Sequence, residues 1–217
     1  MMKHLLVMIL ALSAAACDAE NGNDKVNGSI NVAAGQAPDN ASTVNGAIHV
    51  ASNAAVKHAE TVNGSITIGD QATAESAETV NGSITLGPGA KVSGNLSSVN
   101  GSMTLQKGAD VTGKVENVNG RFNLDGAHVG GGLHTVTGDI TVGADSKVEG
   151  GITVEQVHGF NISFTKDVPV IVIGPGATVQ GALKFGREVK LYVSDRATIG
   201  EVTGATPIKF SGDQPPT

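Results

Sequence analysis

The chain has 217 residues, of which 30 are glycine, only 3% are aromatic and none is tryptophan. This composition excludes an ordinary globular core of large side chains, so a core here has to be built from small aliphatic residues. With 40% hydrophobic and 16% charged residues, the chain is neither disordered nor an integral membrane bundle.

Residues 1–16 have the pattern of a targeting segment. Lys3 gives a positive start, residues 5–12 are apolar, and three alanines stand directly before Cys17, the single cysteine. The apolar stretch is too short to span a bilayer as a stable helix. Small residues before a cysteine resemble the lipobox of bacterial lipoproteins, in which cleavage frees the cysteine for acylation. The resemblance implies a lipoprotein signal peptide over 1–16 and lipidation at Cys17, with plain secretion as the alternative.

The charge of the chain bears on its partners. Without residues 1–16 it carries 13 basic and 20 acidic residues. This negative excess argues against nucleic acid and against an electrostatic hold on anionic lipid. Membrane attachment would depend on acyl chains at Cys17, whose burial contributes about 0.8 kcal/mol per CH₂. We expect a lipid-anchored protein of the bacterial cell envelope, facing the periplasm or the outer surface.

Residues 17–25 are polar and predict a short tether before a repeat that begins at residue 26. The repeat is marked by a valine that returns every 18 to 21 residues, in most units within Val-Asn-Gly. Apolar and polar residues alternate within each unit, which is typical of a β-strand. The repeat valines are Val26, Val44, Val62, Val80, Val99, Val118, Val136 and Val157.

Aligned by this period, the units form apolar columns on three short strands, with Ser, Thr or Asn alternating on the other side. Short strands separated by glycine-bearing corners predict an all-β, single-domain parallel β-helix over residues 26–210, with nine or ten coils of 18–20 residues. The first column is Ile30, Val32, Ile48, Val50, Ile66, Ile68, Ile84, Leu86, Met103, Leu105, Phe122, Leu124, Ile140 and Val142; the second is Val92, Val111, Val129 and Val148; the third is Leu96, Val115, Leu133 and Ile152.

The asparagine of each motif would stack about 4.8 Å from the next, close enough for the side-chain amides to bond in a ladder. Independent Asn-Gly turns with solvated side chains are the alternative. The glycine that follows would occupy one corner of successive coils, where we expect a positive φ. The predicted ladder is Asn27, Asn45, Asn63, Asn81, Asn100 and Asn119, and the corner glycines are Gly28, Gly46, Gly64, Gly82, Gly101 and Gly120.

The last third lacks Val-Asn-Gly but keeps the strands, because segments 84–96 and 171–183 align without a gap. Their Gly-Pro-Gly-Ala-x-Val-x-Gly pattern resembles the bactofilins, bacterial polymer-forming proteins. The resemblance covers residues 80–205 and implies a right-handed β-helix that can self-associate through its coil ends. An enlarged or shortened coil is expected within 155–169, and residues 211–217 predict a disordered tail.

Few polar residues are spaced for catalysis or metal binding. The histidines His49, His58, His128, His134 and His158 fall at different coil positions, so we expect surface histidines and no metal site. Motifs for a nucleophile elbow or a phosphate loop are absent from the sequence. Ser-x-Thr pairs in three units form a hydroxyl grid of the type found in ice-binding β-helices, and strand propensity also accounts for them.

These observations predict a non-enzymatic structural or interaction lipoprotein of the envelope, without catalytic residues, cofactor or metal. The alternative is an adhesin-like or inhibitor module that binds an envelope protein or a glycan with one β-face. A polysaccharide-acting β-helix enzyme and an ice-binding protein are weaker alternatives. Two modes of attachment are expected: to the membrane through Cys17, and to further copies through the coil ends.

Overall fold

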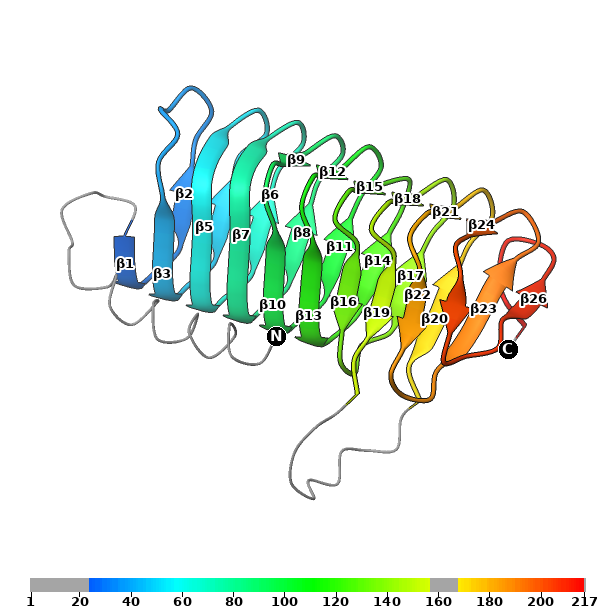
Figure 1. Ribbon diagram of the computed structural model, residues 1–217. Helices are drawn as coiled ribbons and strands as arrows, with labels where there is room; N and C mark the ends of the chain where they lie inside the picture. The colour runs from blue at the N-terminus through cyan, green and yellow to red at the C-terminus, as the bar shows by residue number, and fades with distance from the viewer. Residues whose placement is uncertain (1–23, 157–167, 217) are drawn as a thin grey trace, which may run out of the picture.

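The computed structural model describes residues 24–156 and 168–216, which form β-strands and turns without a helix. Parallel strands stack into a β-solenoid of about nine turns (Figure 1). The predicted all-β, single-domain solenoid is therefore confirmed. The predicted signal peptide, Cys17, Val157 and His158 lie outside the described residues.

The first wall of the solenoid, face A, is a ten-stranded parallel sheet with one strand from each coil. Its strands are β2 (Ile30–Val32), β4 (Ile48–Val50), β6 (Ile66–Ile68), β8 (Ile84–Leu86), β11 (Met103–Leu105), β14 (Phe122–Leu124), β17 (Ile140–Val142), β20 (Val170–Ile173), β23 (Lys190–Ser194) and β26 (Ile208–Phe210).

The second sheet has 16 strands and forms two further walls, faces B and C. The two walls join because the long strand β7 (Thr73–Asn81) pairs with β9 through its first residues and with β10 through its last. Strand β5 (Ala55–Asn63) is equally long. Face B continues with β9 (Lys91–Val92), β12 (Asp110–Val111), β15 (His128–Val129), β18 (Lys147–Val148), β21 (Thr178–Val179) and β24 (Thr198–Ile199). Face C also contains β1 (Asp24–Asn27), β3 (Ala41–Asn45), β10 (Leu96–Asn100), β13 (Val115–Asn119), β16 (Leu133–Thr135), β19 (Ile152–Val154), β22 (Leu183–Phe185) and β25 (Val202–Thr203).

The core is the interior of the solenoid, where the three predicted apolar columns meet. Ile84, Val92 and Leu96 represent one coil of each column, and all three are buried. Alternation along each short strand sends every second side chain inward, and the parallel register places like residues above one another, as in Ile84 beside Met103. Each fully buried aliphatic side chain contributes about 1.5–3 kcal/mol to stability. The stack is therefore stabilised by the large number of its small apolar residues.

The Gly-Pro-Gly-Ala segments occupy equivalent turns between faces A and B. Gly89 and Gly176 both adopt the left-handed conformation there, with φ of 67° and 71°. The two segments also lead from one face A strand to the next face B strand, β8 to β9 and β20 to β21. The gapless alignment of the last third with the earlier coils is confirmed.

The irregular coil is enlarged. Ile140 pairs directly with Ile171, and the same offset of 31 residues recurs between Asp139 and Val170. Ile152 likewise pairs with Leu183, so the stack continues in register across the added residues. The added length lies between β19 and β20, on the corner where earlier coils carry Val-Asn-Gly.

The last strand ends at Phe210, as predicted for the solenoid, whereas its start and the tail beyond it differ from the prediction. Asp24 and Lys25, assigned to the tether, already pair with Ser42 and Thr43 in β3, because the backbone of the first coil extends the sheet. At the other end, Asp213 forms a 2.8 Å ion pair with Arg196. The beginning of the predicted disordered tail is thus held to the last coil.

Candidate interaction face

The valine that marks each repeat points outward from face C. In β3, β7 and β13 it follows a buried residue and is itself partly exposed, so it lies on the solvent side of the sheet. Val26 in the first coil is 53% exposed. With coils about 4.8 Å apart, six valines form a stripe about 24 Å long. This valine stripe consists of Val44, Val62, Val80, Val99, Val118 and Val136.

A column with three glutamates among its six positions, called here the acidic column, runs beside the valine stripe, two residues earlier in each strand: Ser42, Glu60, Glu78, Ser97, Glu116 and His134. Glu60 pairs with Glu78 in register, Glu78 with Ser97, and Ser97 with Glu116. The neighbour of Glu116 on the next coil is His134. Residues two apart on a strand are separated by about 6.7 Å, so the glutamates of this column lie close beside the valine stripe, with an interruption at Ser97, which is 7% exposed.

The acidic column carries like charges at close range. Burial raises the pKa of Glu78 above its ordinary value, and the charges of Glu60 and then Glu116 add to the rise, while His58 opposes it. Burial also lowers the pKa of His134, against the opposing influence of Glu116. Like charges directly opposite each other in a sheet destabilise it. The column is therefore a local cost to the fold.

The predicted asparagine side chains are hydrogen-bonded from coil to coil along the adjacent corner. The Nδ2 of Asn45, Asn63 and Asn81 each donates to the Oδ1 of the preceding asparagine at 3.0 Å. Asn100 donates to Asn81 at 3.1 Å. Asn119 departs from this arrangement, since its Oδ1 accepts from the hydroxyl of Thr137 at 3.3 Å. The asparagines thus join the first five coils at their exposed edge.

A second ladder inside the same corner was missed by the sequence analysis. The buried hydroxyls of Thr61 and Thr79 each donate at 2.9 Å to the carbonyl oxygen of the corner glycine one coil earlier. The signal was present, because the residue before each of the six valines of the stripe is Thr, Ser or Asn. Once the valine faces outward, that residue has to face inward. The column consists of Thr43, Thr61, Thr79, Ser98, Asn117 and Thr135.

The expected positive φ at the corner glycines is wrong for four of six. Gly28 and Gly120 have positive φ, of 111° and 144°. The other four need glycine because the corners stack too closely for a side chain. A Cβ added at any of them would overlap the backbone carbonyl of the corner glycine one coil earlier. At Gly82, for example, it would overlap the carbonyl of Gly64. These four are Gly46, Gly64, Gly82 and Gly101.

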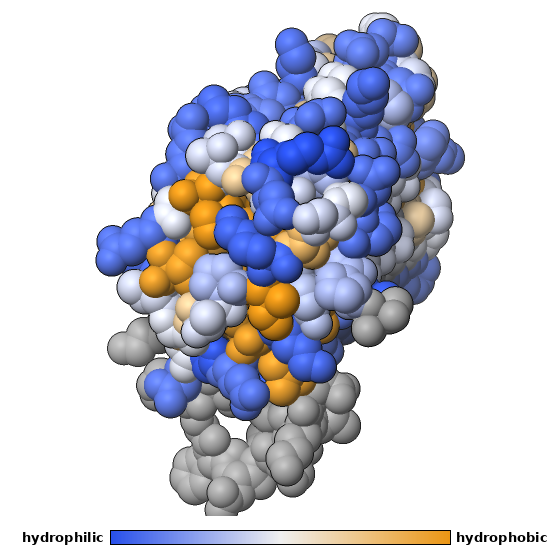
Figure 2. Space-filling model, turned by 90° about the vertical axis from the view of Figure 1, so that its right-hand side faces the viewer, coloured by the Kyte–Doolittle hydropathy of each residue, from blue (hydrophilic) through white to orange (hydrophobic). Residues whose placement is uncertain are grey.

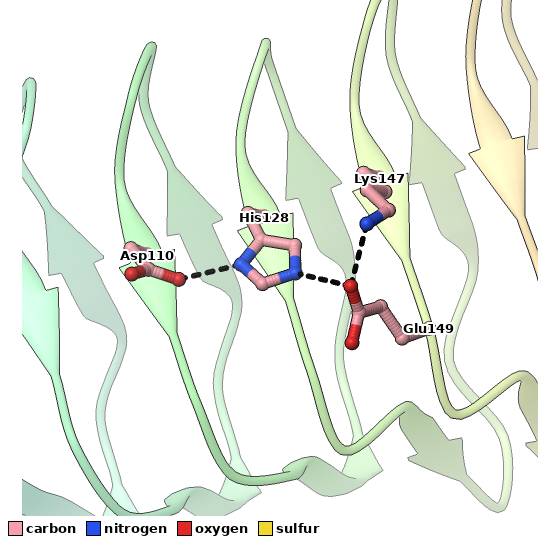
Figure 3. A network of polar contacts seen from close by, with 4 residues as sticks. All are labelled: Asp110, His128, Lys147 and Glu149. Carbon is pink, nitrogen blue, oxygen red and sulfur yellow. Dashed lines mark hydrogen bonds and ion pairs between the residues drawn. The ribbon is translucent and has the colours of Figure 1, made fainter.

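Face B carries a separate polar network across three coils (Figure 3). The Nδ1 of His128 lies 2.6 Å from Asp110 Oδ1, and Lys147 Nζ lies 2.5 Å from Glu149 Oε1. His128 Nε2 lies 3.3 Å from Glu149 Oε1, without the alignment of a hydrogen bond. The hydrogen bond from Lys147, followed by the close contact with the His128 ring, lowers the pKa of Glu149. The network ties neighbouring coils together at the surface.

The described histidines are dispersed over the solenoid. His49 lies on β4, His58 on β5, His128 on β15 and His134 on β16. Among residues 24–156 and 168–216, no group of three or more His, Cys, Asp or Glu residues is placed to hold a metal ion.

The hydroxyl grid of face A is present in register but is partly used by the stack. Thr67 pairs with Thr85, and Thr85 with Thr104. The hydroxyls of Ser65 and Ser83 each accept a backbone N–H from the next coil, in both cases at 3.3 Å. The serine hydroxyls therefore stabilise the corner in addition to facing solvent.

Comparisons with known proteins found no matching family model, no matching curated protein and no matching solved structure. Within the part of the chain that the structure describes, no helix has the length and apolarity needed to cross a bilayer.

Proposed function

We propose that the protein is a non-enzymatic scaffold or interaction lipoprotein of the bacterial cell envelope. The observation that carries this proposal is the unbroken register of the stack. The same columns continue from β2 to β26 on face A, across the enlarged coil. Backbone hydrogen bonds between coils and a continuous core fix outward side chains at regular intervals, which suits a protein that presents a surface to a partner.

The anchor in this proposal is Cys17, acylated after removal of residues 1–16. The test is Cys17→Ser, with Ser13→Ala in the same segment as the matched control. We expect Cys17→Ser to move the protein from the membrane fraction to the soluble fraction and to abolish fatty-acid labelling, while Ser13→Ala changes neither. Labelling that survives Cys17→Ser would overturn the lipoprotein proposal.

The bactofilin-like part of the proposal is limited to a monomer or small oligomer, in which any self-association is made at the C-terminal coil. Ile208 in the last strand is 46% exposed, and Ile199 and Val202 of the same end are partly buried. Figure 2 looks onto this end of the solenoid, where apolar groups lie between polar ones. An end coil also presents unpaired backbone groups to a further strand. Light scattering against protein concentration measures this association.

The second candidate function is a binding module of the adhesin or inhibitor type. The observation that favours it is face C, where the valine stripe and the acidic column lie side by side. Protein recovered from its native envelope after crosslinking distinguishes the two. A binding module loses its crosslinked partner when face C is altered, whereas a scaffold that acts through its ends keeps its neighbours.

A further inference from the structure

We propose that face C is the docking surface for a basic amphipathic polypeptide segment that lies along the solenoid axis. The valine stripe would receive the apolar side of the segment, and the acidic column its lysine or arginine side chains. This inference rests on the proposed interaction function and names the class of partner.

The apolar half of the surface consists of partly exposed valines on the outer side of face C. Core positions of the same strands are filled by Ala77 and Thr79 in β7, while Val80 lies on the solvent side. An outward position on a solvated sheet normally carries a polar residue. Repetition of valine there over six coils gives a straight apolar stripe about 24 Å long. An α-helix of about 16 residues spans that length.

The acidic column of face C favours a basic partner. Glu60 and Glu78 are stacked in register, with Glu116 two coils beyond Glu78. This arrangement destabilises the free protein, and such local conflicts concentrate at functional sites. Lysine or arginine side chains placed between these carboxylates would remove the repulsion. Burial raises the pKa of Glu78, and the neighbouring charge of Glu60 raises it further.

Charge also decides between the possible occupants. A second copy of this chain would bring the same carboxylates and a formal net charge of −6 to the interface. An anionic lipid surface would be repelled as well. A helix has a pitch of 5.4 Å, close to the coil spacing of about 4.8 Å, so one apolar side chain per turn can contact one valine per coil. A basic amphipathic helix therefore fits both columns.

The experiment uses two synthetic peptides of about 16 residues, enough for the length of the stripe. One has leucine along one helical face and lysine along its flank, and the other has the same composition in shuffled order. Binding to the purified full chain is measured by fluorescence anisotropy at low and high salt. We expect the amphipathic peptide to bind at least tenfold more tightly than the shuffled one, and more weakly as salt rises.

Variants locate the binding surface. Combining Val62→Thr, Val80→Thr and Val99→Thr keeps β-branched side chains and is expected to weaken binding at least tenfold. Glu60→Gln with Glu78→Gln is expected to do the same and to reduce the salt dependence. The matched control is Val172→Thr, an outward valine of face A, which should leave binding unchanged. Circular dichroism and thermal unfolding establish that each variant is folded.

Three results would overturn the proposal: equal binding of the two peptides, binding that the face C variants leave unchanged, or self-association that the valine variants abolish. The last result would identify a second copy as the occupant. Failure of the lipid anchor is a separate outcome, because Cys17→Ser changes membrane fractionation and leaves peptide binding intact.

Discussion

The early coils and the last coils close the same corner of the solenoid in different ways. In the early coils the inward residue is polar, as in Thr79, and its hydroxyl bonds a glycine carbonyl of the coil before. Register continues this column from Thr135 to Val154 and then to Phe185, both of which are buried and apolar. A corner of this solenoid can therefore be closed by hydrogen bonds or by apolar packing, and Val-Asn-Gly belongs to the first kind.

The outer surface changes at the same point. The position after the inward column holds Val136 in the last early coil, Glu155 in the enlarged coil and Gly186 in the next. The valine stripe thus ends where the polar corner ends. In Val-Asn-Gly, the asparagine and the glycine form the hydrogen-bonded corner. The valine points outward, and the corner does not require it. The last coils show that the solenoid continues without either.

The largest expected effect concerns the C-terminal end of the solenoid, in the coils whose corners are closed by apolar packing. Pro207 lacks an N–H and stands directly before β26, whose Phe210 is 5% exposed. Deleting residues 206–217 removes this last strand and uncovers β23, an edge with unpaired backbone groups. We expect concentration-dependent elongation of the truncated protein, measured by light scattering. Filaments formed by the intact protein at low concentration would show that the natural end does not cap the stack.

The next largest effect tests which side of face A is the core. Ile84 is fully buried, and Thr85 beside it points outward. Ile84→Asn loses apolar burial and leaves a polar group without a partner, at a cost of about 4 kcal/mol in the free energy of unfolding. Thr85→Asn should cost less than about 1 kcal/mol. Chemical denaturation measures both, and equal losses would mean that the register is wrong.

Glycine substitutions separate two reasons for glycine in the turns of the solenoid, close stacking at a polar corner and a positive φ in the turn after β2. At Gly82 an added Cβ would overlap the carbonyl of Gly64, and φ is not positive. At Gly35 an added Cβ meets nothing within 4 Å, but φ is 82°. We expect Gly82→Ala to destabilise by about 3 kcal/mol, from overpacking against the backbone. Gly35→Ala should cost about 1 kcal/mol. The reverse order would make backbone conformation the dominant requirement.

A substitution of the inward hydroxyl tests the difference between the two corners directly. Thr79→Val keeps the shape and removes the donor to the Gly64 carbonyl, so we expect a loss of about 1–2 kcal/mol. The control is Thr85→Val, an outward change on the adjacent wall, which should alter stability by less than about 0.5 kcal/mol. Thermal unfolding of both variants measures these two changes in stability. No loss in Thr79→Val would mean that the polar corner can take the apolar form without rearrangement.

Much of this architecture could be predicted because a solenoid is specified by local repetition. Alternation places Ile84 inward, and the period of 18 to 19 residues between successive valines places Met103 beside it. The conformation of the corner was harder to predict from the sequence, because the short distance between Gly82 and Gly64 depends on how the coils stack. The polar network of Asp110, His128 and Glu149 was also missed, although Asp110 and His128 pair in register, because its contacts depend on how these side chains turn toward one another at the surface.

The outward direction of the valines was the least accessible part of the candidate face. Valine favours strands wherever it stands, so its identity gives no side of the sheet. Ala77 and Thr79 are two residues apart in β7 and both are buried, so alternation places Val80 on the solvent side. The acidic column follows from the same alternation, and its charges could be listed from the sequence. Their effect on one another depends on the register of Glu60 with Glu78.

The smallest expected effect is the charge cost at Glu78. Burial and then Glu60 raise its pKa in the folded protein above the ordinary value of 4.5, so the ionised carboxylate opposes folding at neutral pH. This penalty disappears as the pH falls through the folded and then the unfolded pKa, because both states are then protonated. Glu78→Gln should therefore raise the melting temperature slightly at pH 7, and the gain should vanish toward pH 4. The exposed Glu201 of the last coil provides the control, since Glu201→Gln should leave the melting temperature unchanged. A gain at Glu78 that persists at low pH would show that packing, and not charge, is responsible.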